Sequence, residues 1–121
     1  MAGILIVDDS RTSRKILRGV LESAGFTVVG EATNGEEGFE KYCTLQPDLV
    51  TMDVTMPQVD GLAALEKIRQ YDPHAKVIMV TAAGQTKKIA TAVRLGAVEY
   101  ITKPFEAQEI EAMICKVLSH I

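Results

Sequence analysis

The chain has 121 residues, 47% hydrophobic and 24% charged, a balance that suits one soluble globular domain and excludes a disordered or membrane-spanning chain. Its net charge of −3 and its lack of a basic tract argue against direct nucleic-acid binding. No apolar run approaches the about 20 residues of a membrane span, and no signal-peptide layout precedes the first strand-like run, so we predict a cytoplasmic location. Cys43 and Cys115 have no CxxC partner, and we predict buried, reduced thiols rather than a metal or redox site.

Two strand–helix units are predicted at the start of the chain. Ile4–Val7 is an all-apolar run, typical of a strand that is buried on both faces of a parallel sheet. A helix follows over Arg11–Ser23, and Gly25 ends it. The apolar face of this helix is predicted to comprise Ile16, Leu17, Val20 and Leu21. A second strand begins at Thr27, and a second helix is predicted over Glu36–Leu45.

The third unit has a strand at Leu49–Asp53, an irregular stretch over residues 54–61, and a helix that Asp72-Pro73 terminates. The fourth begins with a buried strand at Val77–Thr81, and its helix is predicted over Thr86–Leu95. That helix has the weakest apolar face of the set, with Ile89, Val93 and Leu95 as its large apolar residues.

The fifth unit has a strand at Glu99–Thr102 and a helix whose apolar residues run from Ile110 to Ile121. Alternating strands and helices with short buried strands predict an α/β fold, in which helices cover both faces of a parallel sheet. Residues 1–121 are therefore expected to form a single domain, with no output domain attached.

Four of the five predicted strands end in reactive side chains. These strand ends carry Asp8-Asp9, Asp53, Thr81 and Lys103, whereas the second strand offers only the hydroxyl of Thr33. In a doubly wound sheet, ligands bind beyond the carboxyl ends of the strands, where the strand order reverses. A flavodoxin-like order of 2-1-3-4-5 places the second strand at an edge and makes the other four strands neighbours.

Three carboxylates that crowd together repel one another unless one is protonated or a cation lies among them. Oxygen ligands with positions left for water and phosphate suit Mg²⁺. One carboxylate can then attack phosphorus, while Lys103 neutralises charge on the transferring oxygens and the Thr81 hydroxyl donates a hydrogen bond to another.

Each of these residues also has a structural explanation when it is taken alone. An aspartate pair after a strand often only caps the next helix. A threonine at a strand end is usually structural, and a lysine before proline usually lies in a solvated loop. Their joint occurrence at four strand ends favours the functional explanation.

The order and spacing of these residues resemble the receiver domain of bacterial two-component response regulators, over essentially the whole chain. The motifs that carry the resemblance are Ile4–Ser10, Met52-Asp53, Met56-Pro57, Asp60-Gly61, Thr81–Ala83 and Lys103–Phe105. The resemblance implies that Asp53 accepts a phosphoryl group from the phosphohistidine of a histidine kinase. It also implies that Asp9, Asp53 and the Thr55 carbonyl bind Mg²⁺ directly, that Asp8 assists, and that Thr81 and Lys103 bind phosphoryl oxygens.

Further expectations follow from the same resemblance. Tyr100 matches the switch aromatic of the family, and the Lys103-Pro104 bond is expected to be cis. Movement of Thr81 toward the phosphoryl group leaves space for Tyr100, so the signal is read on the surface of the fourth helix, fifth strand and fifth helix. Receivers catalyse only their own Mg²⁺-dependent phosphorylation and dephosphorylation, and we expect no other enzyme activity and a monomer.

Two loops, Thr51–Pro57 and Ala82–Gln85, are similar to those of chemotaxis receivers outside the enteric group. This favours a signal from a chemotaxis-type histidine kinase to a flagellar motor switch protein, with a phosphatase as a further partner. The alternative is a phosphorelay intermediate that passes its phosphoryl group to a histidine phosphotransfer protein. An aspartyl phosphatase resembling the haloacid dehalogenases is disfavoured, because Asp8 and Asp9 are adjacent and no substrate-binding insertion is present.

Overall fold

Strands and helices alternate along the chain in this computed structural model, which describes residues 3–54, 61–82, 86–103 and 106–119. The strands are β1 (Gly3–Val7), β2 (Thr27–Ala32), β3 (Leu49–Asp53), β4 (Val77–Ala82) and β5 (Glu99–Lys103). The helices are α1 (Arg11–Ser23), α2 (Gly35–Leu45), α3 (Gly61–Tyr71), α4 (Thr86–Arg94) and α5 (Ala107–Ser119). The predicted bounds agree with these to within one or two residues at most ends. Ile121, the predicted end of the last helix, lies outside the described residues.

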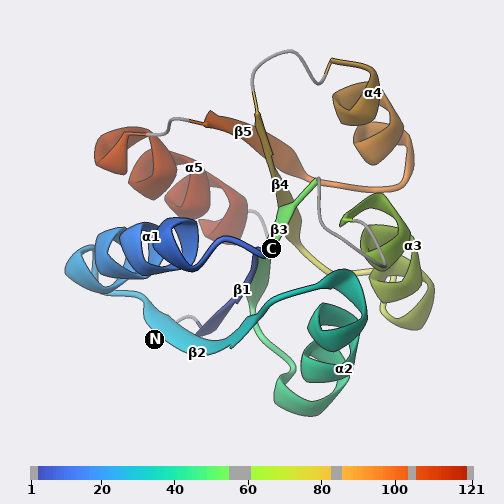
Figure 1. The fold of residues 1–121 in the computed structure, drawn as a ribbon, viewed down its shortest axis with the longest axis horizontal. Coiled ribbons are helices and arrows are strands. Elements are labelled where there is room, and N and C mark those ends of the chain that lie inside the picture. Colours follow the sequence, from blue (N-terminus) through green and yellow to red (C-terminus); the bar gives the residue numbers. More distant parts are fainter. Residues whose placement is uncertain (1–2, 55–60, 83–85, 104–105, 120–121) are drawn as a thin grey trace.

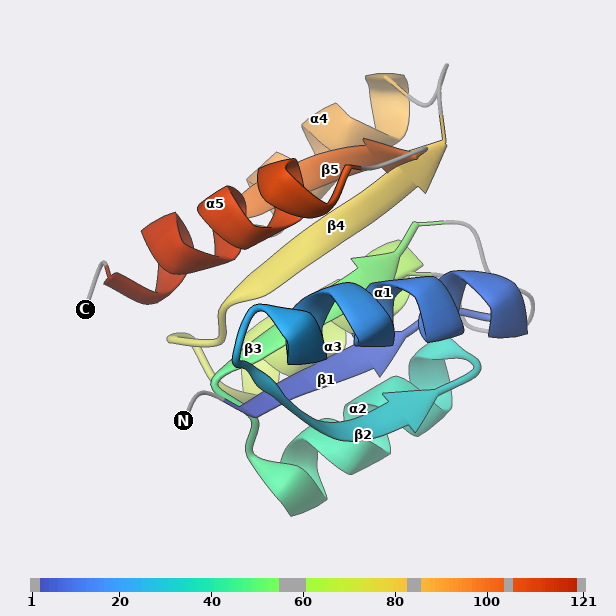
Figure 2. The same cartoon turned by 90° about the vertical axis from the view of Figure 1, so that its left-hand side faces the viewer.

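The five strands form one parallel sheet in the order β2-β1-β3-β4-β5, which confirms the predicted flavodoxin-like topology. Helices α1 and α5 cover one face of the sheet, and α2, α3 and α4 cover the other (Figure 1). Figure 2 shows α1 and α5 side by side in front of the strands. No helix within the described part of the chain combines the length and the apolar character that crossing a bilayer requires.

The hydrophobic core has two layers because successive residues of a strand point to opposite faces of the sheet. Along β1, Ile4 and Ile6 pack with α1 and α5, whereas Leu5 and Val7 pack toward α2 and α3. All five residues of β1 are buried, as its apolar run predicts, and all five residues of β3 are buried as well. These central strands therefore provide a rigid base for the residues that follow them.

Local sequence chemistry sets the limits of α1. The Ser10 side chain accepts a hydrogen bond from the Ser13 N–H and so caps the start of the helix. Gly25 follows the helix with φ of 92°, in the left-handed region that glycine adopts without strain. The observed boundaries of α1 are the predicted ones. Both are set by residues that adjoin the helix in the sequence, Ser10 before it and Gly25 after it.

Some side chains differ from their predicted burial. Ile16 is 54% exposed, since the buried face of α1 is centred on Leu17 and Leu21. On α4, Val93 is also exposed. The predicted burial of the cysteines is wrong for Cys115, which is exposed on the outer side of α5, while Cys43 is partly buried. In each case, which side of the helix faces the sheet depends on tertiary packing and not on apolar character alone.

Candidate functional site

Strand pairing brings the acidic residues of the predicted site together. Val7 of β1 lies beside Met52 of β3, so Asp8 and Asp53 follow from neighbouring positions of parallel strands. Asp8 and Asp53 are only 4% and 7% exposed, whereas Asp9 is exposed. One carboxylate oxygen from each of the three lies within 4.8 Å of the others. The predicted acidic cluster at the carboxyl ends of the central strands is therefore present.

These carboxylates are the oxygen ligands that a hard divalent cation prefers. At this separation their negative charges repel by an amount on the order of kcal/mol even where water screens them. A bound cation removes that repulsion, and an exposed Asp9 leaves one side of the cluster open to water and phosphate. The arrangement fits Mg²⁺, which binds to a few carboxylates and retains water or phosphate oxygens in its other positions.

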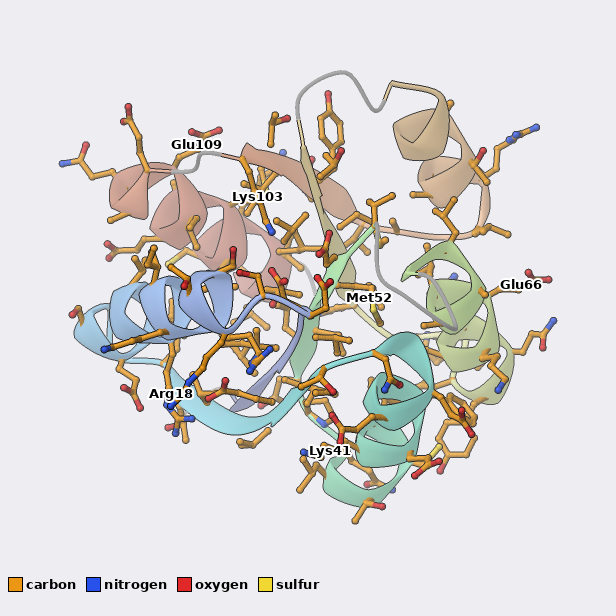
Figure 3. All side chains as sticks on the ribbon, in the orientation of Figure 1. Arg18, Lys41, Met52, Glu66, Lys103 and Glu109 are labelled. Carbon is orange, nitrogen blue, oxygen red and sulfur yellow. The ribbon has the colours of Figure 1, made fainter. Side chains whose placement is uncertain are left out.

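Lys103 extends from the end of β5 into this cluster, between the ends of β1 and β3 (Figure 3). Its Nζ lies 3.1 Å from Asp8 Oδ2 and 3.9 Å from Asp53 Oδ2. The side chain is only 26% exposed, which excludes the alternative that Lys103 is merely a solvated loop residue. The Lys103 ammonium attracts both buried carboxylates and offers a donor to an anion bound at Asp53.

The first aspartate does not serve as the helix cap. Ser10 is the N-cap of α1, and Asp8 Oδ1 instead accepts a hydrogen bond from the Ser10 N–H at 2.8 Å. With Oδ2 contacting Lys103, both oxygens of the Asp8 carboxylate are held. The cluster is thus ordered on the Asp8 side by the loop that leads into α1.

The remaining predicted residues lie around this cluster. Thr81 is fully buried near the end of β4, beside the end of β3. Tyr100, the predicted switch aromatic, lies on the edge strand β5 and is 43% exposed. Thr33 is exposed just beyond the end of β2, the edge strand next to β1. Thr55 and the predicted cis bond before Pro104 lie outside the described residues.

Two residues that the sequence analysis did not single out contact the site. The Ser13 hydroxyl accepts a hydrogen bond from Lys103 Nζ at 3.3 Å, across a sequence separation of 90 residues. Gly61, at the start of α3, donates its N–H to the Val54 carbonyl at 3.2 Å and lies directly against the backbone of Asp53. No local sequence pattern predicts the contact of Ser13 with Lys103. Gly61 belongs to the Asp60-Gly61 motif of the resemblance, but no contact with Asp53 was predicted for it.

Comparisons with known proteins agree with the resemblance to receiver domains. The sequence model of the response regulator receiver domain matches residues 4–115. The chain is 44% identical to the chemotaxis protein CheY of Thermotoga maritima, over 94% of this chain and 95% of that protein. It is 46% identical to the chemotaxis protein CheY of Bacillus subtilis, over 96% and 97% of the two chains.

Among solved structures, the fold is similar to that in the CheX–CheY–BeF₃–Mg²⁺ complex from Borrelia burgdorferi. The TM-score is 0.92 at 35% identity, covering 96% of this chain and 88% of that chain.

Proposed function

Because the chain belongs to the response regulator receiver family, we propose that it is a phosphorylation switch whose Asp53 accepts a phosphoryl group from a histidine kinase. The observation that carries this proposal is the cluster of Asp8, Asp9 and Asp53, with the Lys103 ammonium beside it. Receiver domains bind Mg²⁺ at an acidic pocket, and they are switch proteins rather than metabolic enzymes.

In this proposal an oxygen of the Asp53 carboxylate attacks the phosphorus of a kinase phosphohistidine. The new phosphorus–oxygen bond forms as the phosphorus–nitrogen bond breaks, and the imidazole leaves as the neutral base once it gains a proton. Asp8, Asp9 and Asp53, with the backbone carbonyl of Thr55, would hold Mg²⁺, which neutralises charge on the transferring group.

The chain's own donors complete the site. The Lys103 ammonium, 3.9 Å from Asp53 Oδ2, needs only a small movement to contact a phosphoryl oxygen. The Thr81 hydroxyl lies in the next strand of the sheet and donates to another phosphoryl oxygen. Because Asp53 and Thr81 are buried, their interactions with the added charge are weakly screened by water.

We propose that the signal leaves through α4, β5 and α5. The pull on Thr81 shifts the population of Tyr100 from an exposed to an inward position, and a partner that prefers one state reads the change. The partially exposed Tyr100 and the exposed Val93 on α4 support a surface that can repack without disturbing the core.

We further propose that the chain acts as a receiver in chemotaxis, signalling to the flagellar motor switch. The chemotaxis proteins named above support this, since this chain and each of them cover nearly all of each other's length. Binding of a motor-switch peptide is expected to tighten when the protein is phosphorylated. Equal binding in both states, with transfer of the phosphoryl group to a histidine phosphotransfer protein, would instead establish a relay.

Phosphorylation itself is tested by intact mass after incubation with Mg²⁺ and a small phosphodonor. We expect the parent protein to gain one phosphoryl group and Asp53→Asn to gain none. Glu66→Gln changes an exposed carboxylate outside the cluster and is the matched control, expected to behave as the parent. No gain in the parent, or an equal gain in Asp53→Asn, would refute the mechanism.

A further inference from the structure

The backbone of Asp8 is anchored on both sides by consecutive residues of β2, the strand whose own end carries no residue of the cluster. The Asp8 N–H donates to the Ala32 carbonyl at 3.0 Å. The Asp8 carbonyl accepts from Arg14 Nη1 at 2.7 Å, and Arg14 Nε donates to Glu31 Oε1 at 3.1 Å. The edge strand therefore holds one peptide group of Asp8 directly and the other through Arg14.

Arg14 is suited to this position by its geometry. The planar guanidinium presents donors in fixed directions, so one side chain contacts a carbonyl and a carboxylate at once. Its side chain is only 13% exposed, and Glu31 balances its charge. Hydrogen bonds that are charge-assisted and largely screened from water are among the stronger ones in proteins, so the Asp8 carbonyl has a well-defined direction.

That direction matters for Asp9. The carbonyl of Asp8 belongs to the peptide group that joins Asp8 to Asp9, so its orientation sets where the Asp9 side chain begins. Asp9 is exposed, and no residue in the described part of the chain donates a hydrogen bond to its carboxylate. Among the described residues, the path of the backbone is therefore what brings the Asp9 carboxylate within 4.8 Å of those of Asp8 and Asp53.

We propose that Arg14, held by Glu31, is a positioning residue of the metal site, which fixes the Asp8–Asp9 peptide so that both carboxylates are oriented before Mg²⁺ binds. This inference deepens the proposed function and rests on it for the identity of the cation. Residues that orient metal ligands from outside typically change metal affinity by roughly 10- to 100-fold. Arg14 contacts the backbone of one ligand and not its carboxylate, so we expect the lower end of that range.

The chain offers a matched control in Arg18, one turn further along α1. Arg18 also pairs with Glu31, through Nη1 and Glu31 Oε2, and Figure 3 shows it extending from α1 over β2. Among the described residues, Arg18 makes hydrogen bonds and ion pairs with Glu22 and Glu31 but none with Asp8, and its side chain is 43% exposed. Both Arg14 and Arg18 connect α1 to β2 through Glu31. Of the two, only Arg14 also orients the Asp8 carbonyl.

The experiment is a calorimetric titration of Mg²⁺ into the metal-free protein, for the parent and four variants. Arg14→Gln is expected to weaken Mg²⁺ binding roughly tenfold, and Arg18→Gln to stay within about twofold of the parent. Arg14→Lys keeps the charge but cannot serve both acceptors, so it is expected to recover only part of the affinity. Glu31→Gln is expected to weaken binding in the same direction as Arg14→Gln, by a smaller factor.

Phosphorylation by a small phosphodonor at a series of Mg²⁺ concentrations gives the second measurement. For Arg14→Gln the Mg²⁺ concentration at half-maximal rate is expected to rise, while the rate at saturating Mg²⁺ stays within about twofold. A merely structural role predicts instead a lower unfolding midpoint with unchanged Mg²⁺ dependence.

The outcomes separate the two proposals. Equal weakening in Arg14→Gln and Arg18→Gln, or parent-like affinity in both Arg14 variants, would overturn the positioning role and leave the proposed function intact. A parent protein that binds no Mg²⁺ and accepts no phosphoryl group would overturn both. If Arg14→Gln does not fold, Arg14→Lys and Glu31→Gln decide the question, and parent-like affinity in both would overturn the inference.

Discussion

A β-carbon added to Gly61 would lie 1.9 Å from the backbone carbonyl oxygen of Asp53 and 2.9 Å from Val54 Cα. Both neighbours are backbone atoms at the end of a buried strand, so neither can move without displacing Asp53 itself. Gly61 therefore has no reactive group, yet its lack of a side chain is what allows α3 to begin against the site. The glycine is required by close approach and not by a left-handed backbone.

We predict that Gly61→Ala lowers the free energy of unfolding by about 3 kcal/mol and reduces phosphorylation, because the overpacked methyl group must push Asp53 out of place. The matched control is Gly19→Ala on α1, where an added β-carbon meets no atom within 4 Å. There we expect a gain of up to about 1 kcal/mol, from higher helix propensity. Urea unfolding measures both, and equal effects of the two substitutions would contradict this explanation.

Between elements, a hydrogen bond ties α2 to the end of α3. The buried Tyr42 of α2 donates its hydroxyl to Asp72 Oδ2 at 2.7 Å, just after α3 ends at Tyr71. The hydrogen bond from Tyr42 lowers the pKa of Asp72, and a second bond from the His74 N–H adds to this effect. Burial raises the pKa of Tyr42, and its hydrogen bond to Asp72 raises it further. The rings of Phe39 and Tyr42 both meet Tyr71 edge-on, so the contact is part of an aromatic group between the two helices.

The pKa shifts fix the pH range over which this bond stabilises the protein. Asp72 titrates below its ordinary pKa of about 4, so its contribution is full above that pH and is lost as pH falls through the lower folded value. Tyr42 titrates above its ordinary pKa of about 10, so its contribution is lost as pH rises beyond that value. The bond is therefore expected to stabilise the fold between about pH 4 and pH 10.

We predict that Tyr42→Phe lowers the free energy of unfolding by about 1–2 kcal/mol at neutral pH, and by less at an acidic pH, once the pH falls through the lowered pKa of Asp72. Urea unfolding at the two pH values checks this. Tyr71→Phe keeps the edge-on ring contacts and removes the hydroxyl of a tyrosine that is 53% exposed, so it is the control and is expected to change little. A loss for Tyr42→Phe that is the same at both pH values would contradict the assignment to Asp72.

Over the whole molecule, the helices cover both faces of the sheet and leave the carboxyl ends of the strands to carry the acidic cluster. The cost of that arrangement is electrostatic repulsion in the metal-free protein, which Lys103 offsets in part. A cation that binds the folded chain but not the unfolded one should therefore stabilise the entire fold through mass action.

We predict that Mg²⁺ at about 100 times its dissociation constant raises the free energy of unfolding by about 2.7 kcal/mol. In Asp9→Asn most of this gain is expected to disappear, while the metal-free variant becomes more stable than the parent by about 1 kcal/mol, since one repulsive charge is removed. Unfolding with and without Mg²⁺ measures both. A metal-free Asp9→Asn protein that is less stable than the parent would contradict the repulsion argument.

Features that depend on neighbours along the chain could be predicted from the sequence. Buried apolar runs identified β1 and β4, Gly25 marked the end of α1, and alternation of strand and helix indicated the parallel sheet. The acidic cluster was also predictable, because the carboxyl ends of neighbouring parallel strands meet at one edge of the sheet. For these features the local pattern and the topology carry enough information.

Contacts that a helix or strand makes with another element or with a loop were decided by the tertiary structure alone. The hydrogen bond from Lys103 to Ser13, the anchoring of Asp8 by Arg14, and the approach of Gly61 to Asp53 each join segments whose positions follow from packing. The exposure of Ile16 and Cys115 was likewise decided by which side of each helix the sheet covers. Periodicity and motif spacing describe one segment at a time, so they determine which groups reach the site but not which side chains hold those groups in place.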